Sequence, residues 1–266
     1  MKVIGRSECA RQYPERELTM RIDPIDMLIQ SKERKQSRSI PIGSVCGARF
    51  SSRDVEGMRK TLDEMLARGE SGTKTNPSIF RIARYLLTQS DEFEVQGSLT
   101  GGEAEIVAIR DGGEVLITVG SDQCDRELDP LFQDKPKQMC PHPVATVAWP
   151  YSEVRDHWDR LQIHSRVEIA GYKVTMQESP ASELVDLEYL LAMDSVDAMP
   201  DPMILYCGAV PTLAAAFDTV EKHNLPATMT SGVGEAFLAR LSDPVLGRSI
   251  EHRYRAVPLG DDLHER

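Results

Sequence analysis

The sequence predicts an α+β fold that is rich in strands and carries peripheral helices. From Gly97 onward the hydrophobic pattern is mostly that of strands, with apolar runs bounded by glycine and polar residues. Two of these runs are separated by Asp111-Gly112-Gly113, which is a strong hairpin signal. Helical spacing is limited to a few segments, and we expect these on the outside of the sheets.

A surface helix is predicted within residues 51–70. Its apolar residues recur at helical spacing and are Val55, Met58, Leu62, Met65 and Leu66. Ser51 with Asp54 resembles a capping box, and Gly69 can end the helix. An amphipathic helix of this kind packs its apolar face on a core.

Two hairpins and two further helices are expected later in the chain. Residues 103–119 form the first predicted hairpin, and residues 165–178 are predicted to be two strands around Ala170-Gly171. Short helices are predicted from Ser152 and from Ser182, each with the serine as N-cap.

The first 40 residues are charged and poorly patterned, which indicates an edge segment or a tail rather than core. The basic run of residues 31–38 is interrupted by polar residues, so a solvated loop is expected there. We expect residues 1–95 to form an N-terminal segment with one amphipathic helix. This segment packs on a β-rich, metal-binding core of residues 96–266, or the whole chain forms a single domain.

The composition excludes several classes of protein. Apolar residues make up 41% of the 266 residues, and this is typical of a folded globular protein. The formal net charge of −11 argues against nucleic-acid and anionic-membrane partners, which need a clustered positive surface. The five cysteines include no C-x-x-C pair, so neither a disulfide framework nor a zinc ribbon is expected.

The sequence also favours a cytoplasmic protein. Its first 18 residues lack the continuous apolar core of a signal peptide. The longest uncharged run, residues 203–217, is shorter than the about 20 residues that span a bilayer. We therefore expect a small molecule as the partner, rather than a membrane or a nucleic acid.

Acidic residues stand at one end of the first predicted hairpin. Glu103 and Glu105 project to the same side of a strand whose two sides are otherwise apolar, so unpaired charges there would be costly. For an isolated E-x-E, a basic partner or exposure at the strand start is the ordinary explanation. Asp122 follows the next strand and can return to the same end. Three carboxylates suit Mg²⁺ or Mn²⁺ better than zinc.

The order of several motifs resembles that of the fumarylacetoacetate hydrolase superfamily. The E-x-E motif of that family matches Glu103 and Glu105 in GEAEIVAI, and its N-D-x-x-x-R-D segment matches Asp122 and Arg126 in VGSDQCDREL. Its lysine matches Lys137 in KPKQMCP. The remaining matches are Gln177 in MQES, Cys207 and Gly208 in LYCGAVP, and Arg81 in NPSIFRIARYLL, where the family has lysine.

The resemblance covers about residues 76–256. It implies a mixed β-sandwich roll with peripheral helices, a homodimer, and Mg²⁺ or Mn²⁺ held by Glu103, Glu105 and Asp122. It further implies catalytic roles for Lys137 and Arg126. The substrate contacts that it implies are Arg81, Gln177, Cys207 and Gly208.

Three departures from the family pattern bear on the reaction. The interval from Glu105 to Asp122 is short, because the helix found there in the family is reduced to the Asp-Gly-Gly turn. Cys207 and Ala209 replace threonines whose hydroxyls usually contact substrate. Hydrolases of the superfamily often activate water with a histidine and a glutamate upstream of the metal motif, whereas the first histidine here is His142.

The residues and the resemblance together predict a divalent-metal-dependent hydrolase. Its substrate would be a small 2-oxo or 1,3-dicarbonyl acid, with acylpyruvate-like C–C bond cleavage through a metal-stabilised enolate. A hydratase, decarboxylase or isomerase on the same scaffold is an alternative, favoured by the missing upstream histidine. A non-catalytic binding protein that retains the fold is a third possibility, supported by the changes at Cys207 and Ala209.

Overall fold

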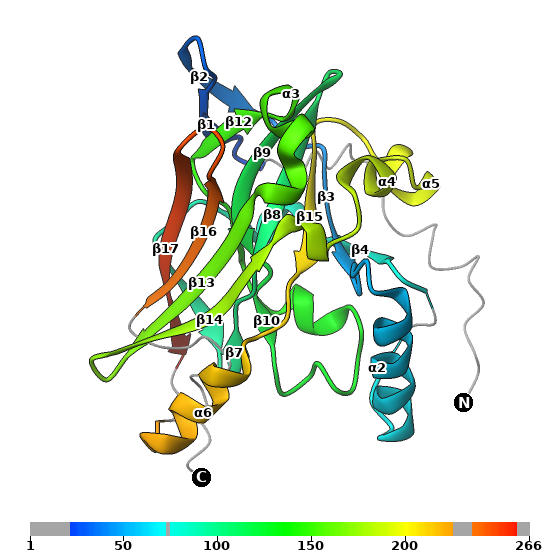
Figure 1. Ribbon diagram of the computed structural model, residues 1–266, viewed down its shortest axis with the longest axis vertical. Coiled ribbons are helices and arrows are strands. Elements are labelled where there is room, and N and C mark those ends of the chain that lie inside the picture. The colour runs from blue at the N-terminus through cyan, green and yellow to red at the C-terminus, as the bar shows by residue number, and fades with distance from the viewer. Residues whose placement is uncertain (1–21, 73–74, 226–235, 260–266) are drawn as a thin grey trace, which may run out of the picture.

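The computed structural model describes residues 22–72, 75–225 and 236–259, and it has the strand-rich α+β fold that the sequence predicts (Figure 1). The first 21 residues of the predicted N-terminal segment and residues 260–266 of the predicted core lie outside the described residues. Two sheets make up most of the fold, and strands distant in sequence pair within each of them.

An eight-stranded mixed sheet contains the predicted hairpin at its centre. In spatial order its strands are β2 (Lys35–Ile40), β1 (Ile25–Gln30), β12 (Val147–Pro150), β9 (Glu114–Ser121), β8 (Ala104–Asp111), β15 (Met203–Ala209), β3 (Ser44–Arg49) and β4 (Ser78–Ile82). The β8–β9 hairpin turns at Gly112-Gly113, both at positive φ, as the Asp-Gly-Gly signal predicts.

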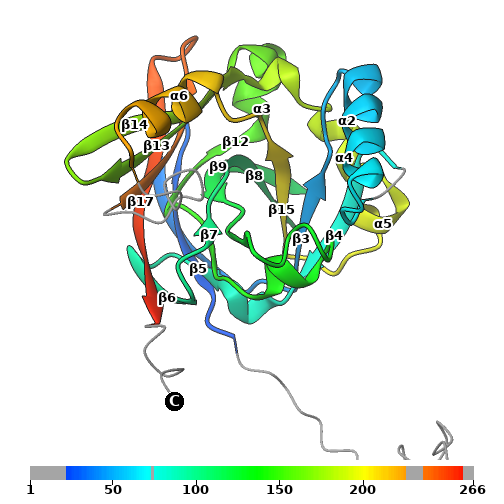
Figure 2. The ribbon, with the colours of Figure 1, turned by 90° about the horizontal axis from the view of Figure 1, so that it is seen from below.

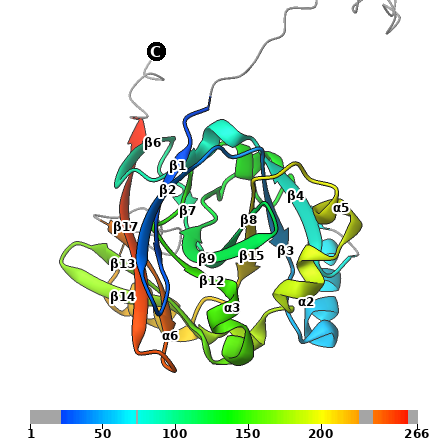
Figure 3. The same cartoon turned by 90° about the horizontal axis from the view of Figure 1, so that it is seen from above.

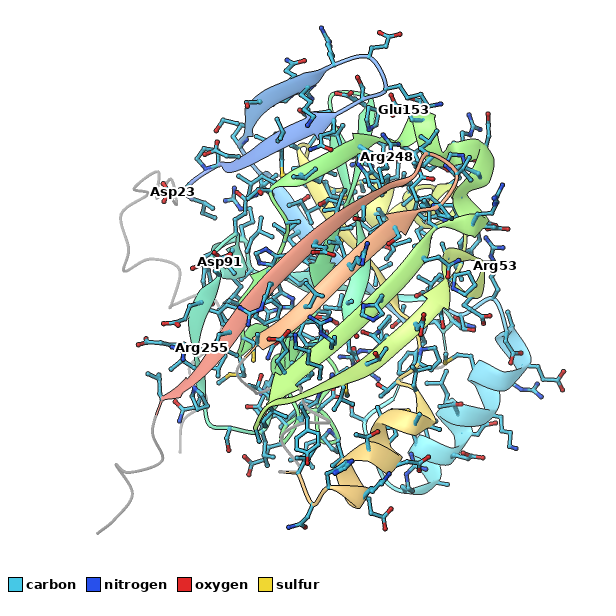
Figure 4. The ribbon with its side chains drawn as sticks, turned by 60° about the vertical axis from the view of Figure 1, so that its left-hand side comes forward. Asp23, Arg53, Asp91, Glu153, Arg248 and Arg255 are labelled. Carbon is cyan, nitrogen blue, oxygen red and sulfur yellow. The ribbon has the colours of Figure 1, made fainter. Side chains whose placement is uncertain are left out.

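A five-stranded sheet forms the second layer. Its strands in order are β14 (Tyr172–Pro180), β13 (Gln162–Ile169), β16 (Ala236–Asp243), β17 (Arg248–Leu259) and β6 (Glu92–Gln96). The predicted turn at Ala170-Gly171 joins β13 to β14. Two short ladders pair β7 (Thr100–Gly101) with β10 (Cys124–Asp125), and β5 (Leu87–Thr88) with β11 (His142–Pro143). Arg248 of β17 lies beside Glu153, with Nη1 and Oε2 2.8 Å apart (Figure 4).

The helices lie outside the sheets, as expected (Figure 2). The α-helices are α2 (Val55–Ala67), α3 (Tyr151–Val154), α4 (Leu187–Leu191), α5 (Asp194–Asp197) and α6 (Ala214–Lys222). Short 3₁₀ helices are η1 (Arg84–Leu86), η2 (Lys135–Gln138), η3 (Arg155–Arg160) and η4 (Ala181–Glu183). None of the described helices is long and apolar enough to cross a membrane.

Both faces of the β8–β9 hairpin are buried, as its sequence predicts. Ala104, Ile106 and Ala108 face the core that lies between the two sheets. Val107 and Ile109 face a second core, around which the eight-stranded sheet curls (Figure 3). Burial of both faces fixes the direction of every side chain on β8, because slippage by one residue would exchange the two faces.

Strands from both sides of the predicted boundary after residue 95 share the sheets. Strands β3 and β4 lie beside β15, and β6 pairs with β17. The predicted N-terminal segment and the predicted core therefore share both sheets. The expectation that the first 40 residues avoid the core is wrong for the hairpin of β1 and β2, because Met27 and Ile40 are buried in the second core. Strand β2 does lie at the sheet edge. Residues 31–34 of the basic run form the turn between β1 and β2, whereas residues 35–38 enter β2 rather than a loop.

Three predicted helix caps are wrong in detail. Helix α2 begins after Asp54, whose side chain accepts from the Gly57 amide at 2.9 Å, whereas Ser51 is buried and donates to the Cys207 carbonyl. Ser152 lies inside α3, which begins directly after Pro150. Ser182 lies inside η4, which begins directly after Pro180. In both cases a proline takes the position at the helix start that the serine was expected to hold.

A bulge in β15 prepares the functional site. The register of β15 against β8 shifts between Tyr206 and Ala209, as happens where one strand carries an extra residue. Gly208 lies in this bulge with φ of +99°. A Cβ atom there would lie 1.7 Å from Ser51 Oγ, so only glycine allows this close approach.

We expect Gly208→Ala to destabilise the protein more than Gly171→Ala. Both glycines have positive φ, but a Cβ at Gly171 meets nothing within 4 Å. The Gly171 variant should lose about 1 kcal/mol from backbone strain alone, and the Gly208 variant a further 1–3 kcal/mol (roughly) from overpacking. Urea unfolding of the two variants measures the difference, and equal losses would contradict the tight packing around the bulge.

Candidate metal centre

Three carboxylates meet at one end of the β8–β9 hairpin. Glu103 precedes β8, Glu105 lies within it, and Asp122 follows β9. The register pairs Glu105 with Gly120, and the Asp122 amide donates to the Glu103 carbonyl at 2.9 Å. One oxygen of each carboxylate lies within 4.8 Å of the other two. The structure therefore brings together the three residues that the sequence predicts as metal ligands.

Glu105 is held at this position by the bulge in β15. Its Oε2 atom accepts a hydrogen bond of 2.7 Å from the Gly208 amide. Burial, and secondly the neighbouring charge of Asp122, raises the pKa of Glu105 well above its ordinary value. The backbone of Gly208 thus orients a predicted metal ligand, whereas the sequence predicts a substrate contact for Gly208.

Lys137 compensates the buried charge of Asp122. Its Nζ lies 2.5 Å from Asp122 Oδ2 and 3.9 Å from Glu103 Oε2, and both Lys137 and Asp122 are buried. Burial alone would raise the pKa of Asp122, but Lys137 and His142 outweigh it and hold that pKa below its usual range. The lysine that the motif order picks out therefore lies in the centre.

Arg126 braces the third carboxylate. Its Nη2 lies 3.2 Å from Glu103 Oε1, and its Nη1 lies 3.6 Å from Asp129 Oδ2. Glu103 is the most accessible of the three acidic residues, with about a third of its side chain exposed. Arg126 therefore lies beside the predicted metal ligands and pairs with Glu103, the one of the three that is not enclosed by protein.

His142 lies behind Asp122 and is fully buried. Its Nε2 donates to the Lys137 carbonyl at 2.7 Å, because a carbonyl oxygen can only accept. Its Nδ1 lies 3.3 Å from Asp122 Oδ1, yet neither atom has a hydrogen bond of good geometry. In the sequence His142 stands out only as the first histidine of the chain, and no spacing signal connects it to Asp122, since the contact depends on how β11 packs.

The donor set suits a divalent cation. Asp122 Oδ1 is a buried acceptor without a hydrogen-bond partner, and such groups are rare in folded proteins unless an ion or water satisfies them. Hard oxygen donors favour Mg²⁺ or Mn²⁺. Glu103, Glu105 and Asp122 therefore fit such an ion, with Lys137 and Arg126 as neighbours.

Three predicted substrate residues do not face the centre. Gln177 is buried, and its side chain accepts from the Ala104 amide at 2.7 Å and donates to the Val210 carbonyl at 2.9 Å. It therefore positions the start of β8. The Cys207 side chain packs in the core between the sheets. Arg81 is exposed on the edge strand β4, while the ring of its buried neighbour Phe80 lies 5.9 Å from Lys137 Nζ.

A cavity of about 300 Å³ opens from the three carboxylates. Arg49, at the end of β3, lines it and was not predicted from the sequence. Its guanidinium donates to the Gln133 carbonyl and lies 3.7 Å from Asp129 Oδ1. Helix α2 forms one wall of the cavity with Met58 and Met65. The predicted amphipathic helix thus contributes to the site.

Cys124 is a buried structural residue. Its thiol is buried, and burial raises its pKa to about 12. Burial is the largest cause of this rise, and the charges of Asp129 and Asp122 add to it. A thiol in this state is a poor nucleophile.

The second sheet braces the strand end that carries Asp122. The Tyr254 hydroxyl of β17 lies 2.8 Å from Ser121 Oγ and 2.7 Å from Gln123 Oε1, so it contacts the residues on both sides of Asp122. Gln123 in turn donates to Thr100 Oγ1 at 3.0 Å. All of these side chains are buried. The network fixes the backbone from which Asp122 projects.

The chain has the fold of the fumarylacetoacetate hydrolase superfamily, and this confirms the resemblance found in the sequence. The family model described as "Protein of unknown function (DUF2848)" matches residues 48–254, and the chain belongs to that family. No curated protein matches the chain significantly.

Three solved structures illustrate the likeness. A protein described as Cg1458 has a TM-score of 0.57 and 11% identity, over 85% of this chain and 83% of that chain. A 2-hydroxyhepta-2,4-diene-1,7-dioate isomerase from Mycobacterium marinum has a TM-score of 0.54 and 12% identity, over 86% and 83%. A 2-keto-3-deoxy-D-arabinonate dehydratase complexed with magnesium and 2,5-dioxopentanoate has a TM-score of 0.54 and 14% identity, over 84% and 77%. Identities this low show a shared fold.

Replacing Glu105 by glutamine is expected to stabilise the metal-free protein. Because burial raises the pKa of Glu105, stability is greatest when the carboxyl is protonated and falls as pH rises from the unfolded-state pKa toward the raised one. Glutamine does not ionise, so the variant keeps the stability that the parent loses as pH rises. Urea unfolding in EDTA at pH 8 should show the variant more stable by about 0.5–2 kcal/mol, and less so at pH 5.

Glu114→Gln is the matched control for this change. Glu114 lies at the other end of the same hairpin and pairs with Arg38 at 2.7 Å, so its loss should leave stability unchanged or slightly lower. A Glu105→Gln protein that is less stable than the parent at pH 8 would show that the protein compensates the charge of Glu105 without a metal ion.

Tyr254→Phe should weaken Mn²⁺ binding by about tenfold or more, the usual effect of losing a group that orients a metal ligand. The free energy of unfolding should fall by only about 1 kcal/mol. Calorimetric titration with Mn²⁺ checks the affinity, and Tyr151→Phe, whose hydroxyl contacts Glu188 at 3.5 Å, is the control. Unchanged Mn²⁺ affinity in the Tyr254 variant would reduce the network to packing alone.

Proposed function

We propose that this protein is a divalent-metal-dependent enzyme that acts on a small 2-oxo or 1,3-dicarbonyl acid and cleaves a C–C bond by hydrolysis. One observation carries the proposal: three carboxylates converge at the end of a cavity whose adjoining wall presents Lys137 and Arg126. This combination suits a substrate with two neighbouring oxygens that becomes negatively charged during the reaction.

Glu103, Glu105 and Asp122 would hold the ion. When bound, Mg²⁺ or Mn²⁺ supplies Lewis acidity for a chelating pair of substrate oxygens. Because the pKa of Glu105 is raised, its carboxyl must lose a proton when it binds the ion. Metal binding is therefore favoured by rising pH. Lys137 and Arg126 keep the neighbouring carboxylates charged and correctly directed.

Lys137 and Arg126 also act on the substrate. Burial alone would lower the pKa of Lys137, but the charges of Asp122 and Glu103 outweigh burial and raise that pKa, so the ammonium stays charged. Its Nζ can stabilise negative charge that develops on a substrate oxygen. The Arg126 guanidinium lines the same cavity, and its planar donors suit a carboxylate.

A hydratase, decarboxylase or isomerase on the same scaffold is the second candidate. The solved structures of this fold favour it, since two of them are an isomerase and a dehydratase, the latter complexed with magnesium and 2,5-dioxopentanoate. These reactions share with C–C hydrolysis the need to stabilise an enolate. One fold hosts many activities, so the products must decide between the two candidates.

Turnover of acetylpyruvate and of oxaloacetate with Mn²⁺ in ¹⁸O-labelled water tests the proposal. Hydrolysis places label in a new carboxylate, and decarboxylation releases CO₂ without it. Asp122→Asn should lower turnover and Mn²⁺ affinity by about 100-fold or more, whereas Glu114→Gln should leave both unchanged. Undiminished turnover in the Asp122 variant would place the reaction elsewhere, and Mn²⁺ binding without turnover of any oxo acid would identify a non-catalytic binding protein.

A further inference from the structure

Beyond the three carboxylates, the cavity has an apolar wall. Met58 and Met65 of α2 line it, together with Val210 and Pro211, which follow β15. Within α2 only Leu62 is buried, so the two methionines are not part of a tightly packed core. Methionine side chains are flexible and polarisable, and they adapt to apolar ligands of different shapes.

The cations that line the cavity are already paired. Lys137 lies 2.5 Å from Asp122, Arg126 lies 3.2 Å from Glu103, and Arg49 lies 3.7 Å from Asp129. Among the described residues that line the cavity, these three are the only basic ones. The first substrate carboxylate can share Arg126 with Glu103, and among the described lining residues no cation without a carboxylate partner remains for a second anionic group.

The charges of the cavity limit the charge of its ligand. The five lining carboxylates are Glu70, Glu103, Glu105, Asp122 and Asp129, against three cations. Glu70 also pairs with Arg68, which does not line the cavity, at 2.5 Å, so four carboxylates remain against the three lining cations. A divalent ion turns this balance into one positive charge, which a single substrate carboxylate neutralises. A second carboxylate would leave the site negative beside the methionines, where like charge and apolar surface both disfavour it.

We propose that the site selects 2-oxo acids with a single carboxylate and an uncharged, apolar tail that rests on Met58 and Met65. This inference rests on the proposed function, because it assumes that the oxo-acid end of the substrate binds at the carboxylates. It separates this chain from the isomerase of the same fold, whose name specifies a dioate. Apolar tails gain affinity from each methylene that they bury against the wall.

The matched pair 2-oxohexanoate and 2-oxoadipate tests the proposal, because the two acids have the same length and differ only at the distal end. Calorimetric titration of the Mn²⁺-loaded protein measures affinity independently of turnover. Pyruvate, which provides the shared 2-oxo acid end alone, is titrated alongside. We expect 2-oxohexanoate to bind tightest and to exceed 2-oxoadipate by about tenfold or more.

Met65→Lys places a cation on the apolar wall, so the variant should bind 2-oxoadipate about tenfold more tightly than 2-oxohexanoate. Ala67→Lys is the control, since Ala67 is on the same helix but lines a different surface groove rather than the cavity. If the parent protein binds pyruvate but binds 2-oxoadipate as tightly as 2-oxohexanoate, or more tightly, this inference is wrong and the proposed function stands. Failure of pyruvate to bind the Mn²⁺-loaded protein overturns the proposed function and the inference with it.

Discussion

Crowding of three carboxylates within 4.8 Å is the constraint on which the surrounding structure depends. Two of them, Glu105 and Asp122, are buried, and buried charges destabilise a fold unless partners compensate them. Lys137 supplies the closest compensation, at 2.5 Å from Asp122, and Arg126 pairs with Glu103. The Gly208 amide supports Glu105 but leaves its negative charge unpaired. The remaining need for positive charge is what a divalent ion would meet.

The fold holds these groups in place by separating rigid support from the open cavity. Both faces of β8 are packed in hydrophobic cores, so the direction of Glu105 is fixed by the strand itself. Polar networks from other elements then fix the strand ends: Gln177 binds the backbone of Ala104, and Tyr254 contacts the two neighbours of Asp122. Such support is what keeps ligands in a productive geometry. The more exposed helix α2 closes one side of the cavity.

The sequence predicts the parts of the site that depend on local geometry. Strand alternation places Glu103 and Glu105 on one side, and the hairpin returns Asp122 to the same end, so these three could be found from spacing alone. Lys137 and Arg126 needed the motif order, because their contacts depend on loops. Arg49 and His142 carry no signal in one sequence, since strands distant along the chain bring them to the centre.

Misplaced predictions have equally specific causes. Arg81 was predicted to contact substrate, but side chains alternate along β4, so Phe80 is buried and Arg81 is exposed. Gln177 has the polarity of a ligand-binding residue, but its amide is used up by backbone partners. The bulge at Gly208 gives that residue a backbone role that no side-chain motif could reveal. Fold class and strand pairing within each hairpin were predictable because they depend on short-range pattern.

A crystal structure of the protein grown with Mn²⁺ tests the central claim most directly, by anomalous scattering from the metal. The account predicts one strong anomalous peak within about 2.5 Å of an oxygen from each of Glu103, Glu105 and Asp122. An anomalous peak at other residues would contradict the account. So would the absence of a peak when the three carboxylates are well ordered and only Lys137 lies between them.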